Sequence, residues 1–146
     1  MRTIKFRAKD FDGVWHYGSL VYSKEIDAAI FFQTGNGAVK RIDWVYVNKE
    51  TIGQFTGIYD AHGKEIYEGD ILKWNNGRLY VVKFWRGMFY ASVEECNEGI
   101  LGGFPLHRLT EYEDEKCEIV GNIYDNPEMK KKYKEIIEIK NPNNNE

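Results

Sequence analysis

The chain of 146 residues is poor in cysteine, in proline and in long apolar runs. Two cysteines are too few for a disulfide scaffold, and three prolines exclude a proline-rich linker protein. No run of about 18 apolar residues occurs, so the sequence predicts no membrane span. Residues 1–7 also lack the apolar stretch of a secretory signal. We therefore expect a cytoplasmic protein whose thiols are reduced.

The composition is typical of a folded domain. Hydrophobic residues make up 42% and charged residues 29% of the chain, which excludes an extended disordered protein. The net charge of −3 argues against the concentrated basic surface that general nucleic-acid binding needs. The length is sufficient for one domain with its own core. We place that domain at residues 1–139 and expect residues 140–146 to form a disordered tail.

Most of the chain has the pattern of short strands separated by turns. Residues 3–8 alternate apolar and polar side chains, and residues 10–13 (DFDG) have the composition of a turn. Further strands are expected at residues 14–22, 28–32, 41–47, 51–59, 64–67, 71–74 and 117–124. Residues 94–110 are rich in glycine and favour a loop. The pattern predicts a mainly β fold, either a curled antiparallel sheet or a small SH3-like barrel with hairpin additions.

One helix is expected, near the C-terminus. Asn126 is a suitable cap and Pro127 a suitable first helical residue, so the helix should cover about residues 127–139. Its apolar stripe would dock on the domain itself or on a neighbouring subunit. The residues of this candidate helix interface are Met129, Tyr133, Ile136 and Ile137.

A three-stranded meander is expected at residues 70–75, 78–85 and 88–93. Asn76-Gly77 and Arg86-Gly87 are suitable two-residue hairpin turns. With both turns, Phe84 opposes Phe89, and Val82 opposes Ala91 and Ile71, on a core face. The opposite face is then unusually apolar for a solvated surface. A three-residue loop at residues 75–77 would exchange the faces of residues 71–74.

Three hypotheses account for the apolar second face of the meander. Another part of the chain covers it, a second subunit covers it, or its aromatic rings stack on single-stranded nucleic acid. The candidate interaction surface consists of Trp74, Lys83, Trp85, Arg86, Met88 and Tyr90.

No catalytic or metal-binding motif stands out. The three histidines, His16, His62 and His107, are scattered, and Cys96 and Cys117 lack the paired spacing of a zinc site. We therefore assign no catalytic residues, no metal and no cofactor. The alternative is an unrecognised hydrolase or metal enzyme that uses Glu65 and Asp70, or Cys96 with His107 and Cys117.

Three segments resemble the YopX family of phage and prophage proteins. They are residues 4–8 (IKFRA), residues 52–71 (IGQFTGIYDAHGKEIYEGDI) and residues 118–128 (EIVGNIYDNPE). The resemblance implies a mainly β protein encoded by a bacteriophage or prophage and located in the bacterial cytoplasm. It supplies no mechanism. The segments themselves consist mostly of glycine, apolar residues and turn acids, a composition typical of a folding signature rather than of an active site.

These observations favour a non-enzymatic accessory protein that acts as a protein-interaction module. We expect it to self-associate, through the meander face or the helix stripe, and a host or phage protein is a further possible partner. Binding of single-stranded nucleic acid is the alternative function, and no membrane partner is expected.

Overall fold

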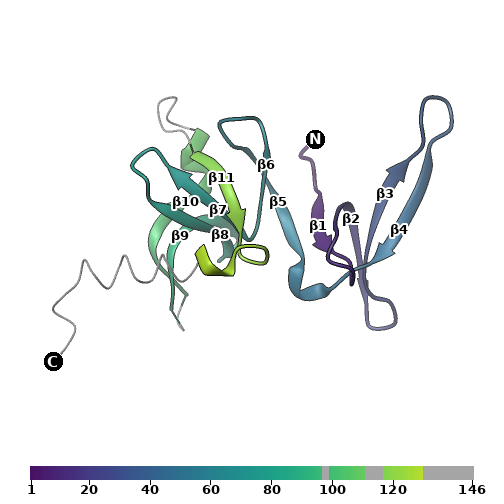
Figure 1. The fold of residues 1–146 in the computed structure, drawn as a ribbon, viewed down its shortest axis with the longest axis horizontal. Helices are drawn as coiled ribbons and strands as arrows, with labels where there is room; N and C mark the ends of the chain where they lie inside the picture. Colours follow the sequence, from purple (N-terminus) through teal and green to yellow (C-terminus); the bar gives the residue numbers. More distant parts are fainter. Residues whose placement is uncertain (97–98, 111–116, 130–146) are drawn as a thin grey trace. The chain divides into compact units, whose positions relative to one another are not determined.

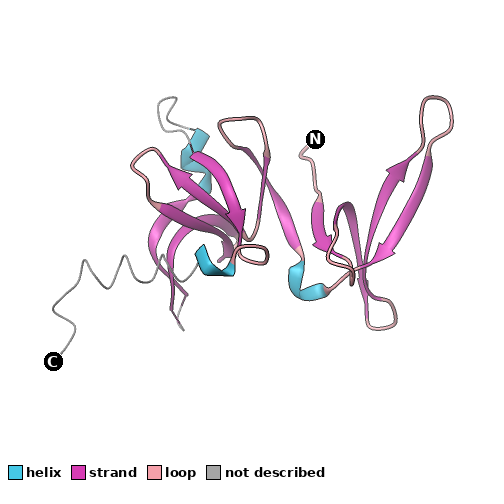
Figure 2. Cartoon of the chain, viewed as in Figure 1, coloured by secondary structure: helices cyan, strands magenta, loops and turns pink. Residues whose placement is uncertain are grey.

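The computed structural model describes residues 1–96, 99–110 and 117–129. The chain divides into two compact units, Met1–Gly57 and Ile58–Glu146. Strands dominate the described residues of both units (Figure 2). The mainly β prediction is therefore confirmed. The curled-sheet alternative agrees with the structure, since neither sheet closes into a barrel over the described residues.

The first unit is built on one antiparallel sheet. Its strands lie in the order β4-β3-β2-β1-β5, and Figure 1 shows β3 and β4 as a long hairpin. A short 3₁₀ helix, η1 (Lys49–Thr51), precedes β5, which passes into the second unit after Gly57. The strands are β1 (Phe6–Lys9), β2 (Trp15–Ser23), β3 (Asp27–Thr34), β4 (Arg41–Tyr46) and β5 (Gly53–Tyr59).

The core of the first unit lies on one face of this sheet. Ala8, Ala28, Ile30 and Val47 are buried at its centre, and partly buried hydrophobic residues surround them. Because side chains alternate between the two faces of a strand, each of these strands also presents a second set of residues on the outer face. The surrounding core residues are Phe6, Leu20, Phe32, Val45 and Ile52.

The second unit contains an antiparallel sheet in the order β10-β9-β8-β7-β11. Its core consists of buried residues from most of these strands, among them Leu72 and Val82, together with Leu106 from a 3₁₀ helix. The short strand β6 lies beside the end of β5. The elements are β6 (Glu65–Tyr67), β7 (Asp70–Trp74), β8 (Leu79–Trp85), β9 (Met88–Cys96), β10 (Gly99–Pro105), the 3₁₀ helix η2 (Leu106–Thr110) and β11 (Cys117–Asn122).

The register of the meander differs from the prediction at its first turn. The N–H of Trp74 donates to the carbonyl of Arg78 at 2.9 Å, so residues 75–77 form a three-residue loop. Leu72 therefore opposes Tyr80, and the expected pairing of Ile71 with Val82 is wrong. The second turn is confirmed, because Phe84 pairs with Phe89 around Arg86-Gly87.

The loop predicted over residues 94–110 is wrong. Strand β9 continues to Cys96, and β10 pairs antiparallel with it, for example Phe104 with Ala91. Glycine and proline in this segment are ordinary loop signals, but the ladder between strands is made by backbone groups and needs no particular side chain. The pairing with β9 outweighs the weak local preference.

The described chain ends in the first turn of a helix that begins at Pro127, as predicted. Asn126 directly precedes this helix, at the expected cap position, and its Oδ1 accepts a hydrogen bond from the N–H of Asn122 at 3.2 Å. The rest of the predicted helix and the tail lie outside the described residues. Within the described part of the chain, no helix is long and apolar enough to span a bilayer.

Candidate interaction surface

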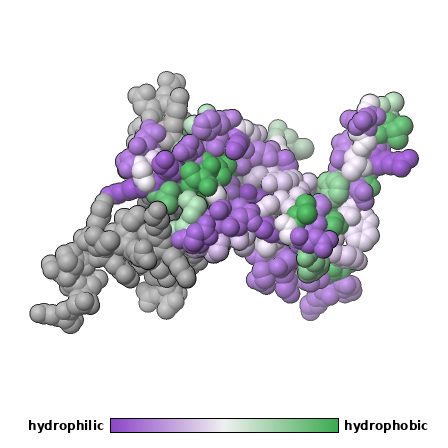
Figure 3. All heavy atoms as spheres, viewed as in Figure 1, coloured by the Kyte–Doolittle hydropathy of each residue, from purple (hydrophilic) through white to green (hydrophobic). Residues whose placement is uncertain are grey.

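The outer face of the first sheet carries a row of exposed apolar side chains over β2, β3 and β4. The register places Ser19 opposite Phe31, and Phe31 opposite Trp44, away from the buried Ile30. Ile42 is 78% exposed, and Trp44 and Tyr46 are each 48% exposed. Figure 3 shows hydrophobic residues on the projecting β3–β4 hairpin. The outer face is here defined as Tyr17, Val21, Phe31, Ile42, Trp44 and Tyr46.

The aromatic rings of the outer face are ordered by contacts with one another. The rings of Phe31 and Trp44 lie 6.1 Å apart between centroids and within 22° of parallel. Tyr46, two residues further along β4, meets Trp44 edge to face at 4.9 Å. Such pairs hold their rings in a fixed arrangement. The outer face is therefore a preformed apolar surface rather than a set of independent side chains.

Strand β4 is also the edge of its sheet. The N–H of Val47 donates to the carbonyl of Ala28 at 3.0 Å, which fixes the hydrogen-bonded pairs between β3 and β4. Because such pairs alternate along an antiparallel ladder, the backbone groups of Ile42, Trp44 and Tyr46 point away from β3. No other described strand pairs with this side of β4.

One outward donor on this edge is already bonded. The Oδ1 of Asp43 accepts a hydrogen bond at 2.9 Å from the backbone N–H of Trp44. A charged residue that covers an edge N–H discourages uncontrolled pairing with other strands. The edge of β4 is therefore partly protected against pairing with other strands.

Sequence reasoning did not single out the outer face. The sequence predicts a strand at residues 41–47, and Ile42, Trp44 and Tyr46 alternate along it. However, alternation alone does not distinguish the covered face of a strand from the exposed one. The open position of β4 in the sheet supplies that distinction.

The six residues of the predicted meander surface do not share one face. Trp74 packs into the second core, with its ring 5.0 Å from that of Phe104 and 6.0 Å from that of Tyr80. The three-residue loop at residues 75–77 places Trp74 on the core face instead of the predicted opposite face. Lys83, Trp85, Met88 and Tyr90 remain on the opposite face, beside the turn that carries Arg86.

The end of the β8–β9 hairpin forms a small cluster of its own. The rings of Trp85 and Tyr90 meet edge to face at 5.8 Å. The guanidinium of Arg86 lies 4.3 Å from the centre of the Trp85 ring. This cation occupies a ring face that a stacking nucleobase would need. Met88 is 43% exposed.

The predicted helix interface is described only at its first residue. Met129 is half-buried, and Gly121 lies close to it. Tyr133, Ile136 and Ile137 lie outside the described residues. The stripe therefore stays a prediction.

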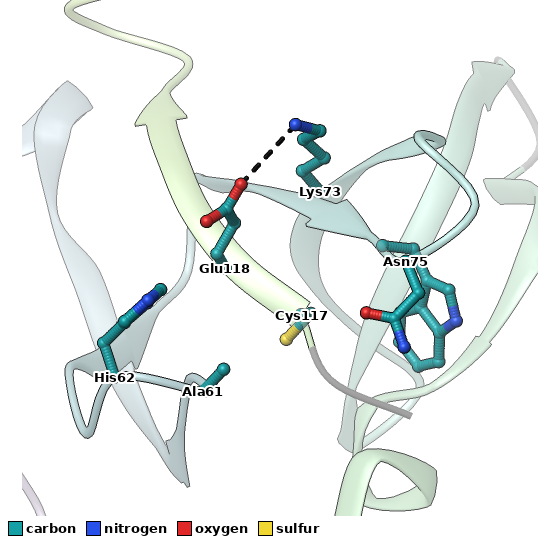
Figure 4. A pocket seen from close by; sticks show the side chains of 7 residues that line it. Ala61, His62, Lys73, Asn75, Cys117 and Glu118 are labelled. Carbon is teal, nitrogen blue, oxygen red and sulfur yellow. Dashed lines mark ion pairs between the residues drawn. The ribbon is translucent and has the colours of Figure 1, made fainter. Parts of the chain in front are cut away.

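A hollow of about 250 Å³ lies in the second unit beside β11. It is closed on one side by the ion pair between Lys73 and Glu118, whose charged atoms are 3.6 Å apart. Figure 4 shows the sulfur of Cys117 on the side of the turn that carries Ala61 and His62. The lining residues are Ala61, His62, Lys73, Trp74, Asn75, Cys117 and Glu118.

The polar groups around this hollow are used for structure. Burial, aided by the charge of Asp60, raises the pKa of Cys117 to about 11, so the thiol is neutral and a poor nucleophile. Burial opposes ionisation of Asp60, but backbone hydrogen bonds from Lys64, Ile119 and His62 outweigh it and lower its pKa. Cysteine, histidine and aspartate thus meet here without an activated nucleophile.

The other candidate reactive groups are engaged as well. The Oδ2 of Asp70 accepts a hydrogen bond from the N–H of Tyr67 at 2.8 Å, and the hydroxyl of Tyr67 donates to Glu65 at 2.7 Å. Among the described residues, no group of three histidine, cysteine or acidic side chains could hold a metal ion. The side chain of Cys96 is not among those described.

The fold and the exposed face define a two-unit, mainly β protein with an apolar sheet surface. The chain belongs to the YopX protein family, whose model matches residues 5–130, and this confirms the predicted resemblance.

The fold recurs in the crystal structure of protein EF1440 from Enterococcus faecalis, with a TM-score of 0.58 and 20% sequence identity. That similarity covers 88% of this chain and 99% of the other, and it shows the fold alone. No match was found among curated proteins.

Proposed function

We propose that the protein is a non-enzymatic interaction module, an accessory protein of a phage or prophage, that self-associates through the outer face of its first unit. The observation that carries the proposal is the exposure of Ile42, Trp44 and Tyr46 on a single face of an edge strand. Contiguous exposed apolar side chains of this kind mark interaction sites on soluble proteins.

Hydrophobic burial supplies the driving force. Complete burial of one large apolar side chain is worth about 1.5–3 kcal/mol. The ring contacts of Phe31, Trp44 and Tyr46 already restrict their rotamers, so less conformational entropy is lost on association. A second copy that covers this face would remove several such side chains from water at once.

The non-enzymatic part of the proposal is supported by the state of the reactive groups. Cys117 is a buried neutral thiol, and both carboxylate oxygens of Asp60 accept backbone hydrogen bonds. These groups stabilise turns and strands of the second unit, which is the role expected of a folding signature.

Light scattering across a concentration series tests the proposal. We expect wild-type protein to exceed the monomer mass of 17.1 kDa, and Trp44→Ser or Ile42→Thr to shift the mass towards the monomer. Phe11→Ser is the matched control, because Phe11 is 77% exposed in a turn of the same unit. A wild-type monomer at the highest concentration, or equal loss in the control, would contradict the proposal.

A further inference from the structure

We infer that two copies of the chain pair edge to edge through antiparallel β4 strands, with Ile42 opposite Ile42 of the second copy and Arg41 opposite Asp43 of the second copy. This inference rests on the proposed function and adds the geometry of the contact. The occupant of the open edge is a second copy because β4 is complementary to itself in charge.

The outward backbone groups limit the possible alignments. Ile42, Trp44 and Tyr46 present their N–H and carbonyl groups to the open side of β4. A two-fold antiparallel contact must therefore be centred on a residue rather than between two residues, and the central positions of β4 are Ile42, Asp43, Trp44 and Val45.

Charge distinguishes these four alignments. Centring on Asp43 places two Asp43 carboxylates directly opposite each other, which is unfavourable. Centring on Trp44 places Asp43 opposite Val45 and Arg41 opposite Val47, so neither charge meets its complement. Centring on Val45 places Asp43 opposite Val47 and Arg41 opposite Lys49, so Asp43 again lacks a complement and two cations face each other. Centring on Ile42 places Arg41 opposite Asp43 twice, once on each side of the two-fold axis. Arg41 and Asp43 are both exposed, so both are accessible for this contact.

The hydrogen bond of Asp43 fits the same alignment. In the single chain its carboxylate accepts from the N–H of Trp44 at 2.9 Å. In the paired strands this N–H donates instead to the carbonyl of Lys40 of the second copy, and the released carboxylate turns to Arg41 of the second copy. Asp43 thus satisfies an edge donor in the isolated chain and selects the partner strand in the pair.

Pairing of the two β4 edges also brings the outer faces of the two copies together. With Ile42 at the axis, the apolar rows of the two copies join into one surface, and Lys40 of each copy lies opposite Trp44 of the other. A lysine beside an exposed tryptophan ring forms a favourable cation–π contact. The edge contact and the apolar face therefore act in one interface.

Charge reversal tests the inference in the full-length protein. Arg41→Asp and Asp43→Arg should each weaken dimerisation by at least about tenfold, because each places like charges opposite each other twice. The double variant R41D/D43R restores opposite pairs and should recover most of the affinity. Loss of affinity in both single variants without recovery in the double variant would overturn the alignment.

Disulfide trapping gives an independent readout. Residues of a hydrogen-bonded antiparallel pair have Cα atoms about 5.5 Å apart, within the range of a disulfide. In a Cys96→Ala background, Ile42→Cys should therefore form a covalent dimer on mild oxidation, and Trp44→Cys should not. Cross-linking of Trp44→Cys instead, or of neither variant, would overturn the inference.

These outcomes separate the inference from the proposed function. A dimer that Trp44→Ser disrupts but charge reversal and cysteine trapping leave unaffected retains the outer face and overturns the edge pairing. A wild-type monomer overturns both. Circular dichroism of each variant establishes that the fold is retained.

Discussion

Two turns, one in each unit, have the same construction. In residues 10–14 and 60–64, the Oδ1 of the first aspartate accepts from the N–H groups two and four residues later, at 2.8–2.9 Å. In both, the aspartate N–H donates to the carbonyl four residues on, and its carbonyl accepts from the glycine N–H. The two sequences, DFDGV and DAHGK, share only aspartate and glycine.

The two turns differ in what the second carboxylate oxygen does. In Asp10 it bonds the Nε2 of His16 at 2.8 Å, within the same hairpin, and the side chain is 16% exposed. In Asp60 it accepts from the N–H of Ile119 at 3.2 Å, 59 residues away, and the side chain is 1% exposed. The same local motif therefore closes a hairpin in one unit and joins distant strands in the other.

Removal of the two carboxylates should separate these roles most strongly. Asp60→Ala leaves three buried or partly buried N–H groups without their acceptor, and we expect a loss of about 3–5 kcal/mol in the free energy of unfolding. Asp10→Ala should cost clearly less, because water replaces the lost acceptor. Urea denaturation of both variants measures the difference, and equal losses would contradict the comparison.

Substitution of the two turn glycines should show that the backbones are equivalent. Gly13 and Gly63 have φ of +86° and +76°, and a Cβ at either would meet nothing within 4 Å. Gly13→Ala and Gly63→Ala should therefore each cost about 1–2 kcal/mol, from the left-handed conformation alone. A much larger loss at Gly63 in the same denaturation assay would mean that packing distinguishes the backbones as well.

Acid should weaken both turns. The hydrogen bond with His16, followed by the N–H of Val14, lowers the pKa of Asp10 below 3.8, and the pKa of Asp60 is also lowered. Near pH 3.8 the unfolded chain then binds more protons than the folded chain. The two carboxylates therefore stabilise the fold above this pH, and the free energy of unfolding falls on acidification.

Urea midpoints between about pH 5 and pH 2 measure this dependence. Asp10→Asn and Asp60→Asn should each make the urea midpoint depend less on pH, because each removes one carboxylate that contributes to this dependence. An unchanged slope in the Asp60→Asn variant would show that this carboxylate does not titrate as its hydrogen bonds require.

The thiol beneath the second turn should give the smallest effect. Since the pKa of Cys117 is raised from 9.0 to about 11, the unfolded chain loses this proton first as pH rises, and stability should fall between these values. In a Cys96→Ala background, a thiol reagent at neutral pH should react slowly with folded protein and rapidly in urea. Equally rapid labelling of the folded protein would contradict the burial of Cys117.

The sequence predicts the strands and turns of this protein better than its surfaces. Local signals located the hairpin at Asp10 and the turn at Arg86-Gly87, because those preferences depend on adjacent residues. The face of Trp74 depended on whether one loop holds two or three residues, a difference that the composition of residues 75–77 does not resolve. The exposure of Trp44 depended on the place of β4 in the sheet, which is a property of the whole topology.

The bond between Asp60 and Ile119 has a consequence for the order of folding. The turn at Asp60 is local and can close before most of the second unit is ordered, whereas the approach of Ile119 requires closure of a 59-residue loop. Asp60 would then be half-satisfied through much of the folding reaction and fully satisfied only when β11 docks. The Oδ1 of Asp60 would thus act in an early step of folding, the closure of its turn, and the Oδ2 in a late step, the docking of β11.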